Sequence, residues 1–161
     1  MISASQLKEF EFFKGFDDAE LELIATVAKE ETFDAGAQMY QNGDPARAIF
    51  LVLEGKIILV MDGSLGSHRP PLQVTVDVVT KGESSGWSAV VEPYIYTLSA
   101  RCIDRTRVIA IDGPGLHKLM EADCLLGMRI MRATCKVIAN RLNHTRIILV
   151  GERGLSALTE Y

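Results

Sequence analysis

Residues 33–44 read FDAGAQMYQNGD and residues 49–61 read IFLVLEGKIILVM, and these two stretches decide the fold. In the second stretch, two five-residue apolar runs flank Glu54-Gly55-Lys56, the pattern of two strands joined by a tight turn. The first stretch adds further glycine turns at Gly36 and Gly43. Short strands separated by such turns are typical of an antiparallel barrel or jelly roll.

The strand pattern continues toward the C-terminus as far as residue 111. Residues 72–79 alternate between aliphatic and polar side chains, with the period of two that marks a half-buried strand. Two more apolar runs follow, at 97–102 and 107–111, and a loop rich in Gly, Ser and Pro is expected at 63–71. The sequence therefore predicts an α+β fold built on an antiparallel double-stranded β-helix, that is, a jelly-roll barrel.

Helical signals lie on both sides of the predicted barrel. Apolar residues recur at helical spacing before Gly15, and Asp17 with Glu20 has the spacing of a capping box. Asp112 followed by Pro114 is typical of another helix start. We expect one domain over residues 1–161, divided as follows: N-terminal helices 1–30, barrel 31–112, C-terminal helices 113–150 and a tail 151–161.

The long C-terminal helix carries an apolar stripe with heptad spacing. Its members are Met128, Met131, Cys135, Ile138, Leu142, Thr145 and Leu149, named the seam below. A second stripe passes through Ile130, Ala133, Val137 and Ile148. A helix with two apolar faces packs one on its own barrel and offers the other to a second copy, so we expect a homodimer. The alternative is one wide core face in a monomer.

The composition is that of an ordinary globular chain, with 48% hydrophobic and 24% charged residues. The net charge of −4 argues against DNA binding through a basic face. No apolar run reaches the roughly 20 residues of a membrane span, and the N-terminus lacks a signal-peptide pattern. Three cysteines, an odd number, fit reduced thiols. We therefore expect a cytoplasmic protein with neither a membrane nor DNA as partner.

In the order of its elements the chain resembles the sensor domain of the cyclic AMP receptor protein and fumarate-nitrate regulator superfamily. The resemblance rests on four stretches: Phe33 to Asp44, the hairpin 49–57, Gly82-Glu83 with residues 86–89, and Asn140-Arg141-Leu142. It implies a regulatory domain that binds a cyclic nucleotide. Transcription factors of the family continue into a helix-turn-helix domain, whereas this sequence ends at Tyr161, so we expect a sensor domain that stands alone.

The resemblance also implies a phosphate-binding cassette. In the family it opens with a short helix that faces the phosphate, its glutamate binds the ribose, and an arginine about a dozen residues later binds the phosphate. Here we expect the cassette to open at Gly82-Glu83 and the arginine position to fall on Ile95, which cannot donate a hydrogen bond. Arg69 and Arg146 are alternative cations. The implied ligand-binding residues are Gly82, Glu83, Ser84, Ser85, Ile95, Tyr96, Thr97 and Thr145.

Other residue types narrow the function. Trp87, Tyr94 and Tyr96 either form an aromatic pocket for a different ligand or fill the barrel mouth. The three histidines are far apart and form no His-x-His metal motif, and no catalytic triad or carboxylate pair stands out. We predict neither an enzyme nor a metal protein, and no cofactor apart from a cyclic nucleotide or another small ligand.

Two functions remain open at this point. One is a regulatory small-molecule sensor whose altered cassette takes a different ligand or none. The other is a ligand-free scaffold that acts by binding a partner protein.

Overall fold

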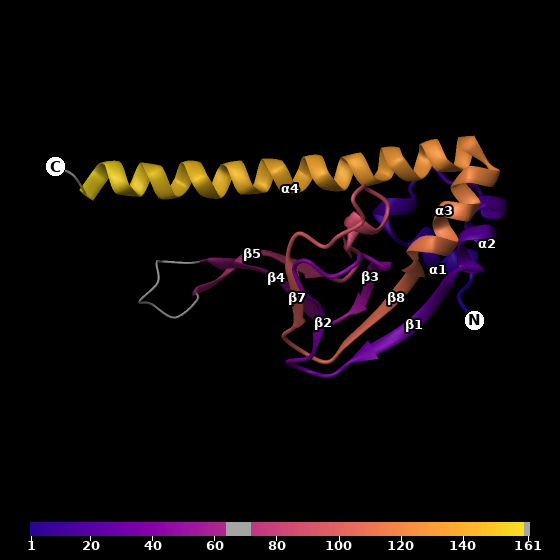
Figure 1. The fold of residues 1–161 in the computed structure, drawn as a ribbon, viewed down its shortest axis with the longest axis horizontal. Coiled ribbons are helices and arrows are strands. Elements are labelled where there is room, and N and C mark those ends of the chain that lie inside the picture. Colours follow the sequence, from indigo (N-terminus) through magenta and orange to yellow (C-terminus); the bar gives the residue numbers. More distant parts are fainter. Residues whose placement is uncertain (64–71, 160–161) are drawn as a thin grey trace.

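The computed structural model describes residues 1–63 and 72–159, with side chains described up to residue 152. The N-terminal helices lie at one end of two small sheets, and a long C-terminal helix runs along one side of the molecule (Figure 1). The predicted loop at 63–71 lies, apart from Gly63, outside the described residues.

Within residues 1–63 and 72–159, eight strands form two four-stranded antiparallel sheets. The first has the order β1 (Ala28–Phe33), β8 (Thr106–Asp112), β3 (Ala48–Glu54) and β6 (Ser84–Ser85). The second has the order β2 (Gln38–Tyr40), β7 (Ser99–Cys102), β4 (Lys56–Gly63) and β5 (Leu72–Thr80).

The predicted antiparallel jelly-roll topology is confirmed, with one correction. Among the described strands the two sheets stay separate, so they do not close into a barrel. The edge strands β6 and β2 have only two and three residues, and are too short to continue the hydrogen-bond ladder from one sheet to the other. β1 begins at Ala28, three residues before the expected start of the strand region.

The hairpin that connects β3 and β4 turns at Gly55, as the sequence predicts. Its φ is +90°, and a Cβ there would lie 2.6 Å from the Thr106 hydroxyl oxygen, so only glycine fits. Part of the core lies between the sheets, where Phe50 of β3 stacks on Tyr40 of β2. Ile49 and Leu51 are also fully buried, and because they alternate with Phe50 they point to the other face of β3. β3 is buried on both faces over four consecutive residues, because the second sheet covers one face and helical segments cover the other.

Short helices precede the sheets: α1 (Ala4–Lys8), the 3-10 helix η1 (Glu11–Phe13) and α2 (Asp18–Ala25). The capping box of Asp17 and Glu20 is confirmed, since each side chain accepts from the other's backbone N–H at 2.9 Å. After β8, the Asp112 carboxylate caps α3 (Gly113–Ala122) by accepting from the Gly115 N–H at 2.7 Å.

The last helix, α4 (Cys124–Thr159), has 36 residues and is about 54 Å long at 1.5 Å per residue. It passes through residues 151–159, where the sequence analysis expects a tail, because Gly151 alone does not end a helix. Its first half packs on the body through Leu126, Ile130 and Ala133. Every side chain from residue 142 to 150 is exposed, and in Figure 1 this half continues past the sheets.

Candidate functional site

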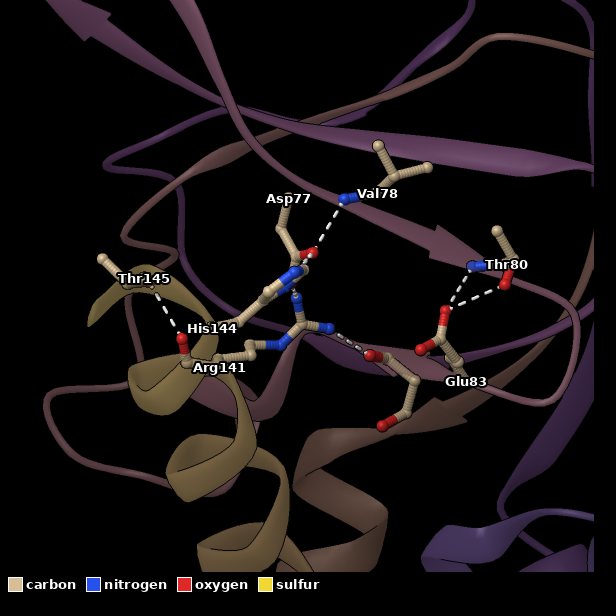
Figure 2. Close-up of polar contacts among 8 residues, drawn as sticks. Asp77, Val78, Thr80, Glu83, Arg141, His144 and Thr145 are labelled. Atoms are coloured by element: carbon tan, nitrogen blue, oxygen red, sulfur yellow. Dashed lines mark hydrogen bonds and ion pairs between the residues drawn. The ribbon is translucent and has the colours of Figure 1, made fainter. Parts of the chain in front are cut away.

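The expected cassette start, Gly82-Glu83, forms the turn between β5 and β6. The Gly82 N–H donates to the Val52 carbonyl at 2.9 Å. The Glu83 carboxylate accepts from the backbone N–H of Thr80 at 2.7 Å and from its hydroxyl at 3.0 Å (Figure 2). Glu83 therefore stabilises its own turn.

The short helix that the resemblance implies begins four residues after the expected position at Gly82. Ser84 and Ser85 are extended, because they pair with Leu51 and Phe50 of β3. The 3-10 helix η2 (Trp87–Ala89) begins after Gly86. Gly86 has a φ of +82°, and a Cβ on it would lie 2.6 Å from the Ala48 carbonyl oxygen, so this close approach to β3 requires glycine.

Ile95 and Tyr96 point in opposite directions, as neighbours in an extended segment do. Ile95 pairs with Pro45 in an isolated bridge and is 41% exposed. Tyr96 is 4% exposed, and its hydroxyl donates to the Ala48 carbonyl at 2.9 Å and accepts from the Ala48 N–H at 3.2 Å. Tyr96, rather than Ile95, therefore faces the space between the sheets and η2.

The ring of Tyr96 is part of an aromatic stack. It lies on Tyr40 with ring centroids 3.7 Å apart, and Tyr40 stacks in turn on Phe50 at 5.8 Å. Burial raises the pKa of Tyr40 to about 12, although the nearby hydroxyl of Ser85 opposes the rise. Burial also raises the pKa of Tyr96. Both phenols therefore stay neutral at physiological pH.

This stack leaves a cavity of only about 20 Å³ beside η2. Tyr40, Trp87, Tyr96, Thr97 and Arg141 are among the residues that line it. Such a volume suits a single water molecule and excludes a nucleotide. The aromatic residues named in the sequence analysis thus fill the space, except Tyr94, which packs edge to face on His117 with ring centroids 4.6 Å apart.

Arg141 reaches from α4 to the cassette region and is the residue that the sequence analysis missed. One of its terminal nitrogens pairs with the Asp77 carboxylate of β5, and the other donates to the Ser84 carbonyl at 2.6 Å (Figure 2). Its side chain is 20% exposed, and its buried Nε has no hydrogen-bond partner among the described residues. A cation therefore does reach this site, from the long helix and not from the cassette.

The remaining expected residues contribute less. The Thr145 hydroxyl donates to the Arg141 carbonyl at 2.9 Å, within its own helix. Arg146 is exposed and does not line the cavity beside η2. Arg69 lies outside the described residues. Ser84 and Ser85 are buried, and the Ser85 hydroxyl has no hydrogen-bond partner in the described structure.

Most of the seam residues are exposed on α4, and Ile148 of the second stripe is exposed as well. Met128, Leu142 and Leu149 are each nearly half exposed, and Cys135 and Thr145 are exposed. The other two seam residues, Met131 and Ile138, are half-buried.

Neither a membrane-spanning helix nor a metal-binding cluster is found within residues 1–63 and 72–159. No helix there combines the length and the hydropathy that a membrane span needs. No group of three His, Cys, Asp or Glu side chains there could hold a metal ion.

Two antiparallel sheets, the short helix η2 after β6 and a long terminal helix define a regulatory sensor domain of the type found in the cyclic AMP receptor superfamily. The family model for the cyclic nucleotide-binding domain matches residues 30–123. The chain belongs to this family.

Solved structures agree with this assignment. A Geobacter metallireducens protein named for cyclic nucleotide binding is 30% identical, with a TM-score of 0.78 over 88% of this chain and 99% of that one. A cyclic nucleotide-binding domain from Methylobacillus flagellatus is 15% identical, with a TM-score of 0.78 over 92% of this chain and 85% of that one. The catabolite activator protein of Thermus thermophilus is 20% identical, with a TM-score of 0.68 over 86% and 61%. No curated protein matches the sequence.

Proposed function

We propose that this chain is a regulatory domain of the cyclic nucleotide-binding family that works without a cyclic nucleotide in the family cavity, because its own side chains fill it. The observation that carries the proposal is Tyr96, which is buried in the cavity and held by two hydrogen bonds to Ala48.

The position of η2 supports a new alignment of the cassette. With the short helix beginning at Trp87, this residue stands where the resemblance implies the ribose-binding glutamate. Tyr96 follows nine residues later, a somewhat shorter spacing than the resemblance implies, and its inward-facing side chain matches the position of the phosphate-binding arginine. Neither side chain offers the carboxylate or the cation that the family chemistry needs.

The cost of opening the cavity can be compared with what a ligand provides. Removing the Tyr96 ring from its site costs about 3 kcal/mol of buried apolar surface. Each of its two hydrogen bonds adds about 1 kcal/mol, so the total is about 5 kcal/mol. A micromolar complex is worth only about 8 kcal/mol. Opening the site would therefore consume more than half of the affinity of such a ligand.

Thermal unfolding in the presence of cyclic AMP or cyclic GMP tests this proposal. We expect no shift of the wild-type midpoint at about 1 mM nucleotide. The variant Trp87→Glu/Tyr96→Arg restores both family groups and removes the ring, and we expect ligand-dependent stabilisation, about 2.7 kcal/mol at a hundredfold excess over Kd. Ile95→Arg is the matched control, since position 95 faces outward and should gain nothing.

The result that refutes the proposal is saturable binding of a cyclic nucleotide to the wild type that Trp87→Glu/Tyr96→Arg strengthens. A gain from Ile95→Arg alone would instead show that position 95 is the arginine position after all.

We also propose that α4 carries the regulatory output as the contact of a homodimer. The exposed seam residues Met128, Leu142 and Leu149 give the helix an apolar face that its own sheets do not cover.

The exposed free thiols of Cys124 and Cys135 support the expected cytoplasmic location, where thiols stay reduced.

The second candidate function, a sensor for a different ligand, is favoured by one observation. Arg141 brings a cation to the edge of the cassette from the helix whose movement would carry a signal.

A further inference from the structure

A second, much larger hollow lies on the other side of Arg141. It runs between η1, the β5–β6 turn and the first half of α4, and its volume is about 880 Å³. This volume is in the range of sites that bind small molecules. It shares Arg141 with the small cavity, but Trp87 and Tyr96 do not line it. We name it the groove.

One wall of the groove is a stripe of donors on α4. Arg129, Arg132 and Lys136 follow one another at helical spacing, and Asn140 and Asn143 continue the stripe by one more turn each. Arg129 is engaged, since it donates to the Glu20 carboxylate at 2.7 Å and to the Gly15 carbonyl at 3.0 Å. Arg132 and Lys136 are exposed and, within the described residues, have neither an ion pair nor a side-chain hydrogen bond.

The acidic residues of the groove already have partners. Asp77 pairs with Arg141, and the Glu83 carboxylate is bound to Thr80. Glu11 lies 3.7 Å from the ammonium group of Lys14. The two cations without partners therefore face a space whose anions are neutralised or hydrogen-bonded, and this arrangement attracts an anion from solution.

The stripe is separate from the seam. Arg129, Arg132 and Lys136 each follow a seam residue directly, so they are turned by about 100° around the helix axis. A second copy bound along the seam leaves this side of the helix to the groove.

The opposite wall and the far end offer apolar contacts. Phe12 and Phe16 come from the N-terminal segment, Val78 from β5, and Val137 and Ile147 from α4. A ligand that fits this surface has a charged end for the donors and an organic part for the apolar side chains. Guanidinium and amide groups together suit phosphate oxygens, which accept several hydrogen bonds at once.

We propose that the groove binds a small phosphate-bearing molecule with at least two negative charges. Arg132 and Lys136 bind the phosphate, and Asn140 and Asn143 supply neutral donors. Because Arg141 in the same wall connects α4 to β5 and β6, occupancy of the groove changes the position of the long helix. The inference concerns a different site from the cavity closed by Tyr96, and it holds independently of that closure.

The test uses pyrophosphate and ADP as probes, added to the full chain in a low-salt buffer free of phosphate. Calorimetric titration gives the Kd, and thermal unfolding confirms it. We expect ADP and pyrophosphate to bind the wild type, and Arg132→Gln/Lys136→Gln to weaken both by about tenfold or more. The control Lys118→Gln/Arg146→Gln removes the same charge from exposed positions outside the groove and should change the Kd by less than about twofold.

Several results would overturn the proposal. Absence of wild-type binding by both probes at about 10 mM refutes it. Equal losses in the two double variants show that the binding is nonspecific. Binding of a hexaglutamate peptide in place of both probes assigns the groove to an acidic protein segment. The variant Trp87→Glu/Tyr96→Arg distinguishes a failure of this proposal from a failure of the proposed function. It changes the cavity closed by Tyr96 and leaves the groove intact, so it should not alter the binding of pyrophosphate or ADP.

Discussion

The contact between Arg141 and Asp77 gives the sharpest test of how α4 is held. We predict that Arg141→Met destabilises the domain by about 2 to 3 kcal/mol. The lost charged hydrogen bond to Asp77 contributes about 1.5 kcal/mol, and the contact with the Ser84 carbonyl about 1 kcal/mol. The two side chains are 20% and 18% exposed, so water screens the pair only in part.

A double-mutant cycle separates the pair from other effects of the substitutions. The four proteins are the wild type, Arg141→Met, Asp77→Asn and the double variant, all unfolded in urea. His144, whose Nδ1 lies 3.6 Å from the same Asp77 carboxylate, stays unchanged in all of them. We expect a coupling energy of about 1 to 2 kcal/mol and a fall in Tm of about 4 to 12 °C for Arg141→Met. Hydrogen exchange adds a local readout, since the backbone amides of α4 around residue 141 should exchange faster in that variant.

The reasoning is refuted if the two single substitutions are additive within about 0.5 kcal/mol, because distant or independent sites behave in that way. It is also refuted if exchange in α4 does not change, because the contact would then stabilise the sheets without holding the helix.

Three further predictions follow from the fold. Burial raises the pKa of Tyr40 to about 12, so the neutral phenol stabilises the folded state. This contribution is complete below pH 10 and is lost as the pH rises to about 12. The loss of stability at alkaline pH should therefore be smaller in Tyr40→Phe than in the wild type, by up to roughly 3 kcal/mol. Ile138→Glu places a charge in the middle of the seam and should convert the proposed dimer to a monomer in sedimentation velocity; an unchanged sedimentation coefficient would show that the seam is internal to one chain. Gly86→Ala should cost about 3 kcal/mol in urea unfolding, since its Cβ would meet the Ala48 carbonyl, whereas Gly43→Ala, with equally positive φ and open space around it, should cost about 1 kcal/mol; equal losses would contradict the steric argument.

The fold could be predicted because its signals are local. The turn at Gly55, the capping box at Asp17 and the cap at Asp112 each depend on residues within a few positions of one another. The strand pattern on both sides of these signals then leaves few topologies. What local signals did not predict is where the edge strands stop, and so the sheets were expected to close into a barrel.

The candidate site was harder to place because it depends on register. Gly82 and Gly86 both have positive φ and both precede a residue that could open a cassette. The pairing of Ser84 and Ser85 with β3 shows that Gly82 lies in a turn and that Gly86 precedes a helix. The same sensitivity explains Ile95 and Tyr96, where a shift by one residue exchanges the inner and outer faces.

Arg141 shows a different limit. It continues the stripe of the buried residues Ile130 and Thr134 and the half-buried Val137 at helical spacing, and this spacing indicates that the Arg141 side chain faces inward. Its partners Asp77 and Ser84 are more than fifty positions away, and no spacing rule connects them.

The part of α4 that follows Arg141 amplifies motion, because a small tilt of the helix near the cassette displaces its C-terminal end by a larger distance. From Arg141, which makes the last hydrogen bond between α4 and the sheets in the described part of the chain, to Thr159 the helix extends about 27 Å. With Arg141 as the fulcrum, a tilt of about 10° displaces the tip by about 5 Å, close to the rise of one helical turn. Over this length, a change in the contacts of the Arg141 side chain alters which residues of α4 face a neighbouring helix.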